Sequence, residues 1–130
     1  MTFTKIKAKL QPTEDPEKVA QAIKNIFGNI ELKSNTNDDL HEAEIHGVNH
    51  LFAFKKRIAQ DRIRSTLYSV FTRWSNVDTL SFGLNRQAAY AGHVSLNLEN
   101  EDPMGPIQVE ISGNIKEVIN FLCEKKSKAV

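Results

Sequence analysis

Hydrophobic and polar positions alternate along the first ten residues of the chain. Lysines take turns there with the apolar side chains Ile6, Ala8 and Leu10. Because successive side chains of a strand point to opposite faces, this pattern predicts a half-buried strand over residues 3–10. Helical spacing follows, with Asp15 as the expected cap, Pro16 at the first helical position and Gly28 as the terminator.

Two further strands are predicted after this helix. Ile30 and Leu32 predict a short second strand, and a third strand is expected to run from Leu40 to Ile45. The polar residues 34–38 between them are typical of a hairpin loop. A connection of this length favours antiparallel pairing.

The longest helical pattern covers residues 51–74. Its first apolar stripe consists of Leu51, Phe54 and Ile58, and its second of Ile63, Leu67, Val70, Phe71 and Trp74. At ~100° per residue the two stripes are out of phase, which favours a break near Gln60 and Asp61. Asp61 is then expected to cap a second helix, and Trp74 to lie in the core. The alternative is a single segment buried on two sides.

A two-residue period returns in the last third of the chain. It predicts three strands, over residues 80–84, 94–98 and 107–111, with loops at 85–92 and 99–106 between them. A last helix is expected to begin at Gly113 or Asn114. The order β-α-β-β-α-α-β-β-β-α predicts one α+β domain over residues 1–124, with a mainly antiparallel sheet and helices on one face. The polar residues 125–130 form a tail.

Composition agrees with one ordinary globular domain. The 130 residues are 40% hydrophobic and 25% charged, and Cys123, the one cysteine, falls in an apolar run typical of a core. The N-terminus lacks the apolar stretch of a signal peptide, and no run approaches the ~20 apolar residues of a membrane helix. These features predict a cytoplasmic protein without a membrane partner.

Charge is distributed unevenly along the chain. Between Lys55 and Arg73 there is one acid, Asp61, and there are six cations: Lys55, Lys56, Arg57, Arg62, Arg64 and Arg73. This segment carries 6 − 1 = +5, whereas the remainder carries 11 cations and 15 acids, a net of −4. A chain that gathers its positive charge in one segment has a directional field even though its net charge is +1.

The basic segment is the first candidate for a nucleic-acid surface. A surface that binds phosphates needs several cations on one side, and arginine contacts phosphate oxygens with two donors. Phe52, Tyr68 and Trp74 lie among the cations, and Tyr68, which falls off the apolar stripe, is the best candidate for stacking on a base. The alternative is a solvated face of two amphipathic helices.

A polar cluster at a predicted strand end is the second candidate. Arg86 is placed to hold a phosphate there, and Gln87 to contact a base edge. In the alternative interpretation, Gln87 satisfies backbone groups of the loop while Ala88 and Ala89 pack beneath a helix. The same small residues up to Gly92 also suit a close contact between subunits.

Motifs of catalysis and metal binding are not found in the sequence. His46 and His50 are four residues apart, but no cysteine or acid completes a zinc spacing nearby. The acidic residues 99–102 lack the order of a calcium loop. The serines have no elbow glycines around them, and there is no glycine-rich phosphate loop. We therefore predict no enzyme, metal, cofactor or small-molecule substrate.

Two motifs give the chain a family resemblance. Residues 85–92 hold a basic-Gln-Ala-Ala-x-x-Gly stretch and residues 103–107 a Pro-x-Gly turn, and together with residues 12–16 they resemble an uncharacterised archaeal protein family. The resemblance covers roughly residues 3–122. It implies a fold similar to large-subunit ribosomal protein five, and RNA binding.

Two functional hypotheses follow. The first is a non-catalytic RNA-binding domain that contacts backbone phosphates through the basic helices, with Arg86 nearby. The second is a protein-interaction or homodimerisation module without nucleic-acid affinity, which uses an open strand edge or residues 87–92.

Overall fold

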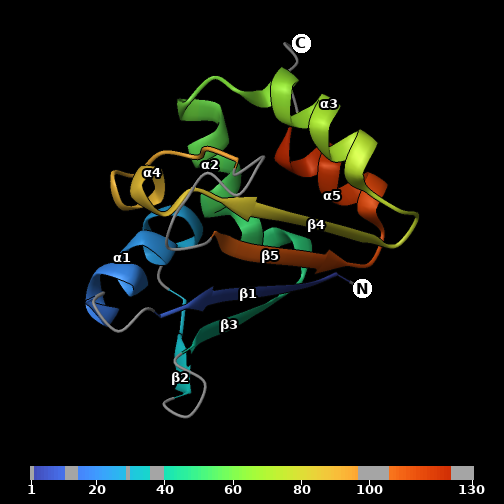
Figure 1. Cartoon of the computed structure of the whole chain (residues 1–130). Coiled ribbons are helices and arrows are strands. Elements are labelled where there is room, and N and C mark those ends of the chain that lie inside the picture. Colours follow the sequence, from blue (N-terminus) through green and yellow to red (C-terminus); the bar gives the residue numbers. More distant parts are fainter. Residues whose placement is uncertain (1, 11–14, 29, 36–39, 97–105, 124–130) are drawn as a thin grey trace.

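An antiparallel sheet with helices on one face forms the fold (Figure 1). The computed structural model describes residues 2–10, 15–28, 30–35, 40–96 and 106–123. The strands in this part of the chain are β1 (Phe3–Lys9), β2 (Lys33–Asn35), β3 (Leu40–His46), β4 (Thr79–Leu84) and β5 (Ile107–Ser112). They lie in the order β2-β3-β1-β5-β4, and every neighbouring pair is antiparallel. The predicted α+β class, with a mainly antiparallel sheet and helices on one face, is confirmed.

Five α-helices and one 3-10 turn are found in the described residues. They are α1 (Pro16–Phe27), η1 (Val48–Leu51), α2 (Phe52–Gln60), α3 (Arg64–Trp74), α4 (Arg86–Tyr90) and α5 (Ile115–Leu122). None of them is long and apolar enough to cross a membrane. The predicted break between α2 and α3 is confirmed.

Strand alternation decides which face of the sheet is buried. On β1 the side chain of Ile6 is fully buried, and its register partners are Ala43 on β3 and Val109 on β5, both also buried. The lysines of β1 point to the opposite, open face. The helices cover the first face because their own apolar stripes are directed toward it.

Four phenylalanines form the centre of the core. The ring centroid of Phe54 on α2 lies 5.0 Å from that of Phe27 on α1 and 6.0 Å from that of Phe82 on β4. Phe71 on α3 lies 4.8 Å from Phe82. Offset and tilted aromatic pairs at these separations are favourable, so the cluster fixes α2 and α3 over the sheet.

The predicted helix ends are largely confirmed. The Asp15 carboxylate accepts a hydrogen bond from the Glu17 N–H at 2.9 Å, and Pro16 is the first residue of α1. Gly28 ends α1 with φ of 89°, a left-handed conformation that glycine adopts without a steric penalty. Asn114 caps α5 by accepting from the Glu117 N–H.

The predicted strand over residues 94–98 is wrong in its described part. Residues 86–90, predicted as loop, form α4 instead, because Asn85 accepts a hydrogen bond from the Ala88 N–H at 2.9 Å and so caps a helix of good helix formers. Leu96 makes only one isolated bridge, to Leu84. Leu98 and the Pro-x-Gly turn lie outside the described residues.

Three smaller predictions need correction. The second strand begins at Lys33, after Ile30 and Leu32, which pack at the edge of the core instead. Asp61 does not cap α3, because the cap position is Ile63, which makes no side-chain hydrogen bond there. The Asp61 carboxylate accepts a hydrogen bond from the Val94 N–H instead. Trp74, predicted to lie in the core, is the last residue of α3 and is 41% exposed.

Candidate nucleic-acid interface

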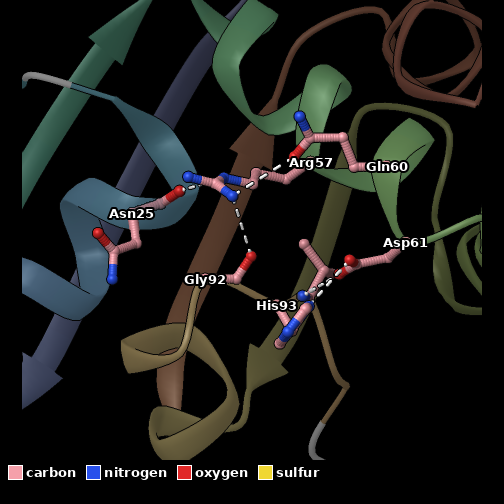
Figure 2. A network of polar contacts seen from close by, with 7 residues as sticks. Asn25, Arg57, Gln60, Asp61, Gly92 and His93 are labelled. Atoms are coloured by element: carbon pink, nitrogen blue, oxygen red, sulfur yellow. Dashed lines mark hydrogen bonds and ion pairs between the residues drawn. The ribbon is translucent and has the colours of Figure 1, made fainter.

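Arg57 links α2 to α1 and to the turn after α4 (Figure 2). It lies on the side of α2 that faces α1 and α4, and its Nε donates to the carbonyl of Asn25 at the end of α1 at 2.7 Å. One terminal nitrogen donates to the Gly92 carbonyl at 3.3 Å and to the Gln60 side chain at 3.4 Å. The guanidinium is therefore occupied by backbone carbonyls of its own chain.

The strand-end polar cluster is also used within the fold. The Asn25 amide donates to the carbonyls of Ala89 and Tyr90, which holds α4 against α1, and Ala89 is fully buried. Arg86 is only 6% exposed, and its guanidinium donates to the Lys9 carbonyl. Gln87 stays exposed. The alanines thus pack against a helix, which was the alternative interpretation of the sequence.

Asp61 makes a second set of stabilising contacts in the same region. Its carboxylate accepts a hydrogen bond from the Val94 N–H at 2.7 Å and lies 3.0 Å from Nδ1 of His93 (Figure 2). Burial raises the pKa of this carboxyl, but the bonds from Val94 and His93 and the nearby charge of Arg57 outweigh it and hold the pKa below its ordinary value. The contact joins the α2–α3 turn to the segment after α4.

We expect the variant Asp61→Ala to lose about 1–2 kcal/mol of unfolding free energy at neutral pH, because it leaves the Val94 N–H without its acceptor. Because the pKa of Asp61 is lower in the folded protein, its contribution to the unfolding free energy is fully present above the pKa of Asp61 in the unfolded chain, about 4. The contribution is lost as the pH falls through the pKa of Asp61 in the folded protein. Urea unfolding at pH 7 and pH 3 measures it. A difference between wild type and variant that does not shrink at low pH would contradict this assignment.

Two more cations of the basic segment lie against α5 and its end. The ammonium of Lys55 lies 4.6 Å from the ring centroid of Phe121, a cation–π contact. Arg64 is half-buried, and its Nε has no hydrogen-bond partner in the part of the chain that the structure describes. Burial raises the pKa of the Cys123 thiol to about 11, against a lowering by the charge of Arg64, so this thiol is a core residue as predicted.

Fewer cations of the basic segment are therefore exposed than the six that the sequence contains. Lys56 on α2, Arg62 in the turn and Arg73 on the last turn of α3 are exposed, and so is Tyr68, at 49%. Arg62 has φ of 57°, so the chain turns sharply at this residue between the two helices. We call the exposed residues Lys56, Arg62, Tyr68 and Arg73, together with the half-buried Arg64, the α2–α3 surface.

Acids are rare around this surface. Asp61 is the one carboxylate in residues 45–77, and its oxygens are bonded to Val94 and His93. The segment that holds this surface therefore carries a net positive charge.

The open face of the sheet has the opposite character. Lys5 on β1 stands between Glu44 on β3 and Glu110 on β5 in the register of the sheet. Lys7 is paired with Glu42, which also faces Lys33 on β2. Cations that alternate with acids across neighbouring strands neutralise one another, so this face offers an anion little attraction.

The sequence did not reveal that Asn25, Arg57 and Arg86 hold the elements of the fold together. The partners of Arg57 lie 32 and 35 residues away along the chain, and the partner of Arg86 lies 77 residues away. No local pattern reveals contacts at such separations. The polar side chain of Asn25 on an otherwise amphipathic helix carried no signal of its role.

Comparison with known proteins gives consistent matches along most of the chain. A family model described as RNA binding matches residues 4–113. A UPF0201 protein of Sulfurisphaera tokodaii is 32% identical over 100% of this chain and 92% of its own length. A UPF0201 protein of Methanosarcina acetivorans is 33% identical, over 95% of this chain and 83% of its own.

A solved structure is similar in fold. The crystal structure of a UPF0201 protein from Methanococcus jannaschii superposes with a TM-score of 0.78 at 29% identity, and the match covers 93% of this chain and 98% of that one. The overall fold is thus similar to that of an experimental structure.

Proposed function

The chain belongs to the UPF0201 family of archaeal proteins and also matches a family model described as RNA binding, and from this premise we propose that it binds RNA through the α2–α3 surface. One observation supports this choice of surface. Lys56, Arg62 and Arg73 are exposed in a segment with one acid, Asp61, whereas the lysines of the sheet face acids in the register of the strands. RNA carries one phosphate charge per nucleotide, so the α2–α3 surface is the one it favours.

The exposed cations have the simplest roles in this proposal. Arg62 and Arg73 contact phosphate oxygens, since a guanidinium offers a planar pair of donors, and Lys56 adds a mobile point charge. Arg64 and Lys55, which lie partly against the protein, contribute to the potential of the surface.

The remaining candidate residues, Arg57, Arg86 and Gln87, lie beside the α2–α3 surface or support it from within the fold. Arg57 and Arg86 hold α2 and α4 in place, and their charges add to the field from within. Gln87 is exposed at the start of α4 and can reach a ribose or a base edge beside the surface. The likeness to large-subunit ribosomal protein five, which the motif resemblance implies, agrees with an RNA partner and stays a prediction.

Tyr68 tests this assignment through a matched pair of tyrosines. Tyr68 on α3 and Tyr90 on α4 are exposed to nearly the same extent, 49% and 51%. We expect Tyr68→Ala to weaken RNA binding by about tenfold, near the lower end of what packing of an aromatic ring on one nucleotide contributes. Tyr90→Ala, on α4 outside the α2–α3 surface, is expected to cause a much smaller loss of affinity. Fluorescence anisotropy with a labelled RNA measures both, and equal effects of the two variants would contradict the placement.

A further inference from the structure

The outward side of α3 carries a row of hydroxyl groups. Leu67, Val70 and Phe71 are buried on its inner side. At ~100° per residue the opposite side presents Ser65, Ser69 and Thr72, and all three are exposed. Their spacing of four and three residues gives one stripe ~10 Å long.

Cations stand at both ends of this stripe. Arg62 precedes the first turn of α3, Arg73 lies in the last turn, and no acid occurs in residues 62–77. A neutral row of small donors and acceptors is thus bracketed by positive charge. This arrangement suits a ligand that has hydroxyl groups in the middle and phosphates on either side.

The shallow minor groove of an A-form helix has that composition. It displays the ribose 2′-hydroxyls between two phosphate backbones and is wide enough to admit protein side chains. Serine and threonine hydroxyls both donate and accept hydrogen bonds, which matches a 2′-hydroxyl, and their small size lets the helix approach closely.

A single strand fits this stripe less well. Proteins that bind single strands without sequence preference use rows of aromatic side chains on which successive bases stack. The centre of the outward side of α3 offers hydroxyls instead, and Tyr68 lies at its flank, where its ring meets the edge of the groove.

We propose that the ligand of the α2–α3 surface is double-stranded RNA, with the Ser65–Ser69–Thr72 stripe in the minor groove and Arg62 and Arg73 on the flanking phosphates. The inference rests on the RNA binding proposed above and specifies its ligand. It also predicts discrimination against DNA, because a B-form duplex has no 2′-hydroxyls and a narrower minor groove.

The test compares three labelled probes with the full chain by fluorescence anisotropy. They are an RNA duplex of about 16 base pairs, one of its strands alone, and the DNA duplex of the same sequence. We expect the RNA duplex to bind about tenfold or more tightly than either of the others. The triple variant Ser65→Ala, Ser69→Ala, Thr72→Ala is expected to lose most of this preference while it keeps its helix, since alanine is the best helix former.

A matched control is Ser81→Ala, which removes an exposed hydroxyl from β4 on the open face of the sheet and is expected to change nothing. A single strand that binds as tightly as the duplex, or a triple variant with unchanged duplex affinity, would overturn the duplex assignment and leave the basic surface standing. Absence of binding to every RNA probe at low salt would overturn the proposed function itself.

Discussion

Replacing Arg62 and Arg73 by glutamate is expected to weaken RNA binding about 100-fold or more. Each arginine is exposed, and residues 45–77 hold one carboxylate, Asp61. A hydrogen bond to a charged group contributes about 1.5–3 kcal/mol, so the loss of two such contacts alone corresponds to about 3 kcal/mol. The introduced acids add repulsion from the phosphates. Fluorescence anisotropy across a protein titration measures the loss.

A control variant separates this local effect from the change in net charge. Lys9→Glu with Lys18→Glu alters the charge of the chain by the same amount, at two exposed positions on β1 and α1, away from α3 (Figure 1). We expect this variant to bind RNA within a few-fold of wild type, as screened distant charges contribute little. Equal losses in the two double variants would contradict a localised site.

Arg57→Ala is expected to destabilise the fold by about 2–4 kcal/mol. The truncation removes the donors to the carbonyls of Asn25 and Gly92, so α2 loses its link to α1 and to the turn after α4. Hydrogen bonds made by a charged donor are worth more than neutral ones, and the two partly buried carbonyls lose their partner. Urea unfolding followed by circular dichroism gives the difference in free energy.

The adjacent residue provides the control. Lys56 lies on the exposed side of the same helix, and Lys56→Ala is expected to change stability by no more than about 0.5 kcal/mol. The order of the two variants should be reversed for RNA affinity. At temperatures below its unfolding transition, Arg57→Ala keeps most of its RNA affinity, whereas Lys56→Ala loses part of it. Unchanged stability of Arg57→Ala would contradict its fastening role.

Much of the fold was predictable because its elements have strong periodic patterns. The alternation of β1 and the two apolar stripes of α2 and α3 each bury one face, and the phase shift between the stripes located the break near Asp61. α4 was missed because five residues are too short to show a helical period. The residue pair Asn85 and Ala88, a cap and its donor, was the one local signal available.

The candidate site was predictable in its charge and not in its geometry. Counting charges located the basic segment, and the resemblance of two motifs to an archaeal family is confirmed by the family model and the UPF0201 relatives. The direction of each side chain depended on partners far along the chain. Arg57 and Arg86 bond to carbonyls of other elements, whereas Arg62 and Arg73 remain exposed.

The salt dependence of RNA binding tests the central claim most directly. If three or four cations of the α2–α3 surface meet phosphates, log K plotted against log salt concentration should fall with a slope of roughly −3, and the Arg62→Glu, Arg73→Glu variant should show a flatter line. A slope near zero would contradict phosphate contact. So would the absence of RNA affinity at low salt in a chain that light scattering shows to be a stable dimer, the result expected of a protein-interaction module.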